Sequence, residues 1–208
     1  MYFIGDVHGK TKKLVELIDY NPYQWFQVGD MGLGFKGVYL PEFPRDKFRF
    51  IRGNHDSPQA CQNHINYAGD FGYRSESELF FMGGAWSIDY KMRTPGVSWW
   101  QDEELSPEEL NRAFYCYSQV KPRIVVTHEA PEAIGRILMM RLSGIGNFYY
   151  SGNTGAYVQT RTSQTLQQMF DIYQPEHWVF GHYHIDEEID FKGTKFHCLN
   201  ELSVKEIK

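Results

Sequence analysis

The chain has 208 residues, of which 42% are hydrophobic and 23% are charged, proportions that are typical of globular proteins. This length predicts a single domain over residues 1–208 with a sizeable core. The net charge is −5 and there is no basic block or acidic tail, so non-specific binding to nucleic acid or to an anionic membrane is not expected.

The cysteines and the N-terminus indicate the compartment. Cys61, Cys116 and Cys198 are odd in number and far apart, so they predict reduced thiols rather than a disulfide framework or a zinc knuckle. The segment "MYFIGDVHG" lacks the basic and apolar regions of a signal peptide, and no apolar run approaches the length of a transmembrane helix. We therefore expect a cytoplasmic protein that does not bind a membrane.

Short apolar runs alternate with helical patterns along the chain. A strand at "YFIG" is followed by a helix at "KTKKLVELIDY", strands at "WFQVG" and "FRFIRG", and one or two strands within "ELFFMGGAWSI". A helix at "SPEELNRAFYCY" comes next, with Ser106 as the expected N-cap and Glu109 as its capping-box partner. The strand "RIVVTH", the helix "TSQTLQQMFDIY", the strand "HWVFGH" and a hairpin of "EEIDF" and "TKFHCL" complete the pattern. This order predicts an α/β fold with late antiparallel strands, and the aperiodic stretch over about 139–156 predicts a lid loop.

Five of the predicted strands are each followed by Asp, Asn or His, and four of these residues come directly after a glycine. Ligands of α/β folds gather at the carboxyl ends of the strands, so we expect these side chains to form one site. The candidate donors are Asp6, His8, Asp30, Asn54, His128, His182 and His184. Oxygen and imidazole donors without a thiolate suit Mn, Fe, Zn, Co or Ni. Seven donors exceed the four of a tetrahedral zinc, so the pattern predicts two metal ions sharing a carboxylate.

Each of these features alone has a simpler explanation. Gly, Asn and Asp are common turn residues, and a lone His-x-His is more often incidental than metal-binding. A single-metal oxygenase or lyase would need only a His/carboxylate triad, but it would leave Asn54 and His55 unexplained. His64, His177 and His197 fall outside the pattern, and we expect structural or surface roles for them.

The motifs "GDVHG", "GDMG", "GNHD", "VVTHEAP" and "GHYH", in this order, resemble the five motifs of the calcineurin-like metallophosphoesterases. The resemblance implies a four-layer α/β/β/α sandwich with two central mixed sheets, the second of which includes the C-terminal hairpin. It implies a first metal on Asp6, His8 and His184, a second on Asn54, His128 and His182, and Asp30 as the bridge. Manganese is the foremost candidate ion.

The resemblance also implies a reaction, in which hydroxide held between the metals attacks a phosphomonoester or a phosphodiester. His55 would face the phosphate as general acid for the leaving oxygen. Arg52 would help to place the phosphate, and Asp56 completes the catalytic group as the last residue of its motif.

One motif departs from the pattern of the protein Ser/Thr phosphatases, which carry Asp-Arg where "GDMGLGFKG" has Leu33 and Gly34. This departure argues against a protein phosphatase, unless Arg93, Arg136 or Arg141 replaces the missing arginine. A non-catalytic metal-binding interaction module on the same fold is a further alternative. The substrate (small molecule, nucleotide or phosphoprotein) and the oligomeric state are open at this point. Aromatic residues that could stack a nucleobase, form an oligomer interface or simply pack are Trp99, Trp100, Phe148, Tyr149 and Tyr150.

Overall fold

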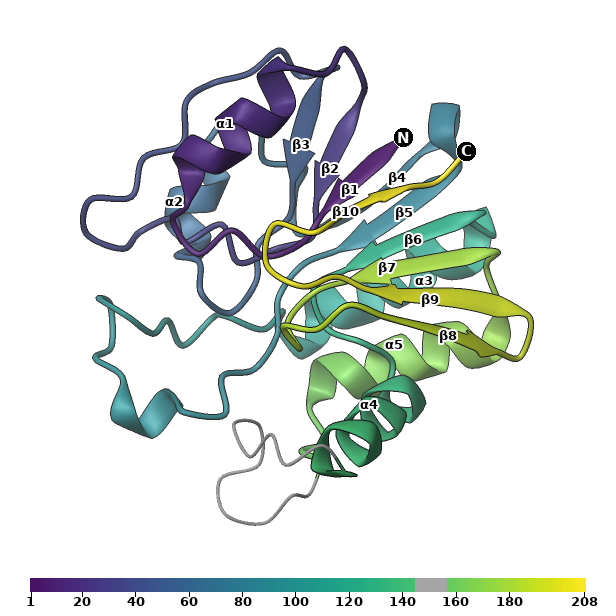
Figure 1. Ribbon diagram of the computed structural model, residues 1–208. Helices are drawn as coiled ribbons and strands as arrows, with labels where there is room; N and C mark the ends of the chain where they lie inside the picture. Colours follow the sequence, from purple (N-terminus) through teal and green to yellow (C-terminus); the bar gives the residue numbers. More distant parts are fainter. Residues whose placement is uncertain (145–156) are drawn as a thin grey trace.

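The computed structural model describes residues 1–144 and 157–208, which form two β-sheets flanked by helices (Figure 1). The first sheet has the strand order β10-β1-β2-β3. Its strands are β1 (Tyr2–Ile4), β2 (Trp25–Gln27), β3 (Phe48–Phe50) and β10 (Val204–Glu206). β1, β2 and β3 are parallel, and β10 pairs antiparallel with β1. The sheet is therefore mixed, and its three parallel strands have their carboxyl ends at the same edge.

The second sheet has the strand order β4-β5-β6-β7-β9-β8. Its strands are β4 (Phe71–Arg74), β5 (Leu79–Met82), β6 (Ile124–Thr127), β7 (His177–Phe180), β8 (Glu187–Phe191) and β9 (Thr194–Cys198). The strands from β5 to β9 through β6 and β7 are parallel, whereas β4 and β8 are antiparallel edges. β8 and β9 form the predicted hairpin, with positive φ at both turn residues, Lys192 and Gly193, as a two-residue turn of type I′ requires.

Helices cover the outer face of each sheet. The helices α1 (Thr11–Asp19) and α2 (Pro58–Gln62) lie by the first sheet, and α3 (Pro107–Val120), α4 (Glu132–Gly144) and α5 (Arg161–Ile172) lie by the second (Figure 1). Short 3-10 turns are formed at Ser75–Ser77 and Tyr90–Met92.

The side chains of each strand alternate between these layers. Phe26 and Phe81 meet between the two sheets, with ring centroids 5.7 Å apart. Phe80, the neighbour of Phe81, faces the opposite way and packs on Tyr117 of α3. Leu14 of α1 is buried against the outer face of the first sheet. The predicted four-layer α/β/β/α sandwich is therefore confirmed, and the hairpin belongs to its second sheet as expected.

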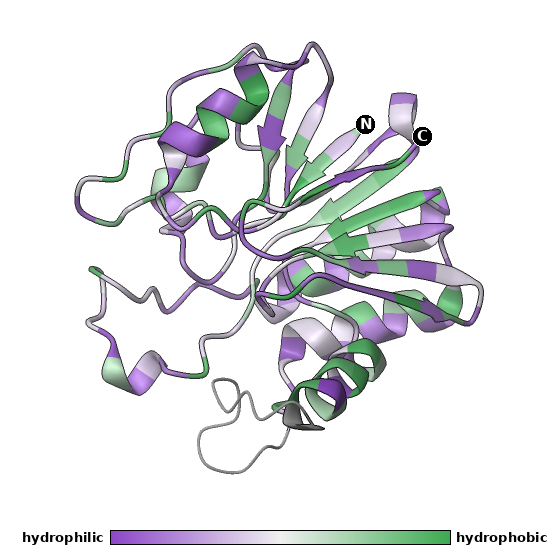
Figure 2. Cartoon of the chain, viewed as in Figure 1, coloured by the Kyte–Doolittle hydropathy of each residue, from purple (hydrophilic) through white to green (hydrophobic). Residues whose placement is uncertain are grey.

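The distribution of hydrophobic residues along the chain matches the layers of the fold (Figure 2). β5 and β6, which lie in the interior of the second sheet, are hydrophobic along their length, whereas α1 has one hydrophobic and one hydrophilic side. Within residues 1–144 and 157–208, no helix is long and apolar enough to cross a membrane.

The expected helix boundaries agree with the observed ones. α3 begins with a capping box in which the Ser106 side chain accepts from the Glu109 amide and the Glu109 side chain accepts from the Ser106 amide. α1 and α5 lie where helical periodicity was predicted, and α5 ends before Pro175.

One sequence-based expectation needs correction. Residues 139–144 are not loop but the end of α4, where Met139 and Leu142 are buried against the second sheet; residues 145–156 of the predicted lid lie outside the described part of the chain. Of the one or two strands expected within "ELFFMGGAWSI", the structure has one, β5. Beyond the double glycine, Ser87 is hydrogen-bonded to Asn54 and Glu103.

Candidate metal centre

The polar strand ends of both sheets meet at one site. Asp6, Asp30 and Asn54 follow β1, β2 and β3 of the first sheet, and His128 and His182 follow β6 and β7 of the second. The site therefore lies where the carboxyl-end edges of the two sheets come together.

Four of the candidate ligands have a left-handed backbone conformation. The φ angles are 46° for His8, 57° for Asp30, 68° for His182 and 52° for His184. This region is costly for residues other than glycine, and such strain concentrates at functional sites. Here the strained backbone turns four ligand side chains toward a common centre.

The first cluster consists of Asp6, His8, Asp30 and His184, whose ligand atoms all lie within 4.8 Å of one another. The Nε2 atoms of His8 and His184 are 3.0 Å apart, and His184 Nε2 is 3.2 Å from a carboxylate oxygen of Asp6. Two imidazole nitrogens and two carboxylates thus converge on one point. A divalent cation fits this donor set.

The second cluster has the side-chain oxygen of Asn54 at its centre. Asn54 Oδ1 lies 3.2 Å from His128 Nε2 and 3.0 Å from His182 Nδ1. His128 is fully buried, and its other ring nitrogen, Nδ1, lies 3.0 Å from the carbonyl oxygen of Val28. A proton on Nδ1 donates to this carbonyl and leaves Nε2 free to bind a metal.

Asp30 joins the two clusters. Its Oδ1 lies 3.2 Å from His128 Nε2, and its Oδ2 lies 3.7 Å from His8 Nε2. Oδ1 also accepts a hydrogen bond from the backbone amide of His55 at 2.7 Å, which holds the carboxylate in place. The side chains expected to hold two metals are therefore all present, and the residue expected to bridge them stands between the two groups.

Glycines permit this close approach of strands and ligands. A Cβ atom on Gly53 would come within 2.2 Å of Asp30 Oδ1, and one on Gly181 would come within 2.1 Å of Asp6 Oδ1. Contacts this short are impossible, so a side chain at either position would displace a ligand.

The two central ligands influence each other's protonation. Burial alone would raise the pKa of Asp30, but the neighbouring imidazoles, His128 foremost, hold it well below its usual range. Burial would likewise lower the pKa of His128, but the carboxylates of Asp30 and Asp6 raise it to about 10. The carboxylates of Asp6 and Asp30 therefore favour a positive charge at this position, which is the charge that a metal ion would supply.

His55 stands beside the clusters and contacts Arg93. Its ring makes an edge contact with His8 at 5.0 Å between centroids, and its Nε2 lies 2.5 Å from a terminal nitrogen of Arg93. Arg93 is held in turn by Asp89, at 2.7 Å from Nε. Burial lowers the pKa of His55 to about 4, and Arg93 acts in the same direction against the opposing effect of Asp30. Of the three arginines considered as substitutes for the missing arginine, Arg93 is the one among the described lining residues of the cavity beside His55.

Asp56 is held by backbone amides, and within the described part of the chain none of its hydrogen bonds comes from His55. Its fully buried carboxylate accepts hydrogen bonds from the backbone amides of Met31, Gly32, Leu33 and Gly53. Burial, together with the charge of Asp30, raises the pKa of Asp56 to about 7, although the amides of Gly53, Leu33 and Met31 favour the charged form. The contacts show a residue that ties the second motif to the third, and its assignment to the catalytic group stays a prediction.

Arg52 is buried, with 3% of its surface exposed, and its contacts are internal. Its Nε lies 2.7 Å from Asp70 Oδ1, and its NH1 donates to the carbonyl oxygens of Asp102 and Glu103 at 2.9 and 2.7 Å. These bonds fasten the segment before α3 to the end of β3. Its expected help in placing the phosphate is untested, and it does not line the cavity at the site.

Sequence reasoning missed three residues that orient the ligands. Ser87 Oγ accepts from Asn54 Nδ2 at 3.0 Å and donates to Glu103 at 2.6 Å. Glu129 lies with a carboxylate oxygen 3.6 Å from His182 Nε2, and it accepts a 2.6 Å hydrogen bond from the Tyr183 hydroxyl. Glu129 stands directly after His128 in its motif, whereas no local signal marks Ser87 or Glu103.

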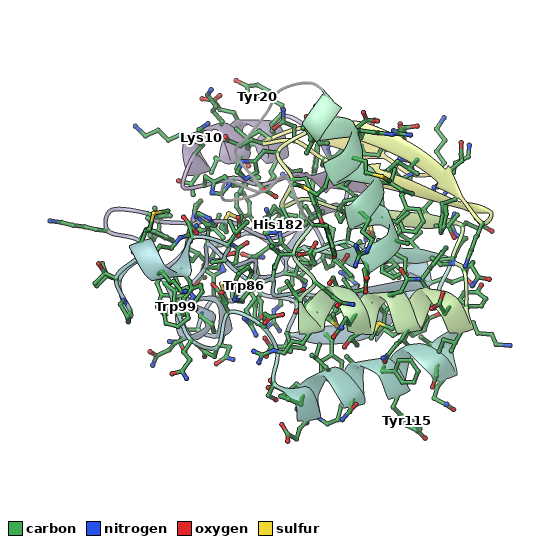
Figure 3. All side chains as sticks on the ribbon, turned by 90° about the horizontal axis from the view of Figure 1, so that it is seen from below. Lys10, Tyr20, Trp86, Trp99, Tyr115 and His182 are labelled. Atoms are coloured by element: carbon green, nitrogen blue, oxygen red, sulfur yellow. The ribbon has the colours of Figure 1, made fainter. Side chains whose placement is uncertain are left out.

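A cavity of about 630 Å³ opens from the metal-ligand clusters. Residues of both clusters line it, and so do His55 and Arg93. Figure 3 shows His182 in the middle of the molecule with Trp86 near it and Trp99 farther out. Trp99 and Trp100 are half-buried and contact other aromatic rings, which agrees with a packing role; the aromatics at 148–150 lie outside the described residues.

Comparison with known proteins identifies the family of the chain. Phosphopantetheinyl hydrolase (PptH) from Mycobacterium tuberculosis has a similar fold, with a TM-score of 0.52, 13% identity, and coverage of 96% of this chain and 89% of that one. GAP50, the anchor in the inner membrane complex of Plasmodium, is also 13% identical over 96% of this chain and 71% of that one, with a TM-score of 0.48. No curated protein matches the sequence. The profile of the calcineurin-like phosphoesterases matches residues 1–186, so the chain belongs to that family.

Proposed function

We propose that this protein is a metal-dependent phosphoesterase with two divalent ions, manganese foremost, that hydrolyses a phosphomonoester or a phosphodiester. The observation that carries the proposal is the position of Asp30, whose carboxylate faces both ligand clusters while its Oδ1 accepts from the backbone of His55. A single metal would use the first cluster and leave Asn54, His128 and His182 without a function.

The ligands divide into two groups around the shared carboxylate. Asp6, His8 and His184 would hold one ion, and Asn54, His128 and His182 would hold the other. When bound, the two ions supply a nucleophile at neutral pH and compensate the negative charge of the phosphoryl oxygens.

Arg93 and His55 act on the substrate from the side of the cavity. Arg93 is an additional cation beside the clusters and is placed to hold a phosphoryl oxygen. His55 is neutral in the free protein because its pKa is lowered to about 4. A negatively charged phosphoester next to the ring favours the protonated form, so substrate binding itself would prepare His55 to give a proton to the leaving oxygen.

The test is turnover of simple substrates. Protein reconstituted with manganese is incubated with p-nitrophenyl phosphate and with bis-p-nitrophenyl phosphate, and phenolate release is followed with and without a chelator. We expect metal-dependent hydrolysis of at least one of the two. Bound metal without hydrolysis of either ester or of a phosphopeptide would refute the enzyme and favour the non-catalytic interaction module. The cytoplasmic location expected from the sequence remains a prediction.

A further inference from the structure

The cavity at the metal centre has apolar as well as polar lining residues. Much of its apolar lining comes from two segments in different parts of the chain. The loop between β5 and α3 contributes Trp86 and Ile88, and α4 contributes Met139 and Leu142. Further apolar side chains of the lining are Met92, Val158 and Ile185.

This lining is too extensive for a phosphate group alone. The cavity measures about 630 Å³, which is the size of a pocket that buries a medium-sized organic ligand. Ile88 and Val158 are 38% and 41% exposed, so apolar surface at this mouth remains in contact with water in the free protein. A ligand that covers such surface gains binding free energy.

The charges around the cavity fit one phosphoryl group and no more. Among the described lining residues, Arg93 is the one lysine or arginine, and its Nε already contacts Asp89. Glu129 also lines the cavity, but its carboxylate is engaged by the Tyr183 hydroxyl and the Ala130 amide. A second phosphate or a carboxylate on the substrate would therefore face apolar and acidic groups.

We infer that the phosphoester cleaved at this site carries an uncharged and largely apolar organic group, alkyl or aryl, which lies against Trp86, Ile88, Met139 and Leu142. This inference rests on the proposed function, because it assigns the remainder of the substrate whose phosphoryl group binds the metals. It disfavours polyphosphates and acidic phosphopeptides as substrates.

A homologous series of esters tests the inference. The rate of phosphate release is measured for ethyl, butyl, hexyl and octyl phosphate, and the rate of alcohol release is measured for the corresponding methyl alkyl diesters, both with manganese-loaded protein. A buried CH₂ contributes roughly 0.8 kcal/mol, so kcat/KM is expected to rise about fourfold for each carbon until the chain fills the cavity. Binding of octylphosphonate, followed by calorimetry, is expected to be tighter than that of ethylphosphonate and to show a negative heat-capacity change.

Substitutions at exposed lining residues test whether the dependence on chain length arises in this cavity. Ile88→Asp and Val158→Asp introduce charge on exposed apolar positions, so both are expected to flatten the dependence on chain length. Val97→Asp is the matched control, because Val97 is 61% exposed on the same loop and does not line the cavity. This control is expected to behave as the parent protein.

The outcomes separate the two proposals. Hydrolysis with no dependence on chain length, or with a preference for substrates that carry a second charge, would overturn the inference and leave the phosphoesterase intact. An unchanged chain-length dependence in both aspartate variants would also overturn it. Failure to hydrolyse any ester with metal bound would overturn the proposed function itself.

Discussion

Ser87→Ala tests the second ligand cluster without removing a candidate metal ligand, because Ser87 contacts the ligand Asn54 and is not a ligand itself. Its hydroxyl accepts from Asn54 Nδ2 only while the amide is oriented with Oδ1 toward His128 and His182. Rotation of the amide by 180° would present a donor, the NH₂ group, to the metal instead of an oxygen. Ser87 therefore selects the orientation of Asn54 that can bind a cation.

The expected loss of metal affinity follows from the hydrogen bonds that the variant removes. The hydrogen bond between Asn54 and Ser87 is buried and contributes about 1 kcal/mol to the preferred orientation. Loss of a hydrogen bond that orients a metal ligand typically lowers metal affinity by about 10–100-fold. We expect a loss near the lower end of this range at the second site and none at the first. The variant also leaves one buried oxygen of Glu103 without its 2.6 Å donor, which costs about 1–3 kcal/mol of folding free energy. For a chain of this length, that cost lowers Tm by several degrees, on the order of 2–4 °C per kcal/mol.

Calorimetric titration of the metal-free protein with manganese measures the two sites separately. Ser118→Ala is the control, since the Ser118 hydroxyl donates to Tyr115 within α3, away from the site. Equal weakening of both sites would point to general damage rather than to loss of orientation. Unchanged affinity at both sites would refute the reasoning about Asn54.

Three further results are expected. Asp30→Asn should lose bound metal and activity together, because the Asp30 carboxylate faces both clusters. Metal analysis and p-nitrophenyl phosphate turnover of the same sample measure both losses. Full metal occupancy of both sites in this variant would contradict the expectation. His55→Ala should retain both metals and lose activity by on the order of 10²-fold, and loss of metal instead would make His55 a ligand. Metal affinity should rise with pH by about tenfold per unit between pH 7 and 9, because the His128 proton, with a pKa raised to about 10, must leave before metal binds. Titration in buffers of different ionisation enthalpy should show release of that proton, and a flat pH profile would exclude this competition.

The strands and their polar ends could be predicted because both signals are local. An apolar run followed by glycine and a metal-binding residue indicates both the strand and its functional end, and parallel strands place those ends at one edge. Asp30 and Asn54 were accordingly assigned from the sequence, and the structure places them in contact with the expected partners.

The parts that could not be predicted depend on the path of long connections. Arg93 reaches His55, and Ser87 reaches Asn54, only because the loop between β5 and α3 folds back over the site, and this loop has no periodicity. α4 was not predicted from the sequence, and it contains Gly135, a poor helix former. The absence of a side chain at Gly135 is explained by the neighbouring ring of Tyr157, which would lie 2.4 Å from a Cβ atom.

The most direct test of the two-metal centre is anomalous diffraction from crystals grown with manganese. The account predicts two peaks, one among Asp6, His8 and His184 and one among Asn54, His128 and His182, with Asp30 bound to both. A single peak at saturating manganese, with Asn54 and His128 free of metal, would contradict it.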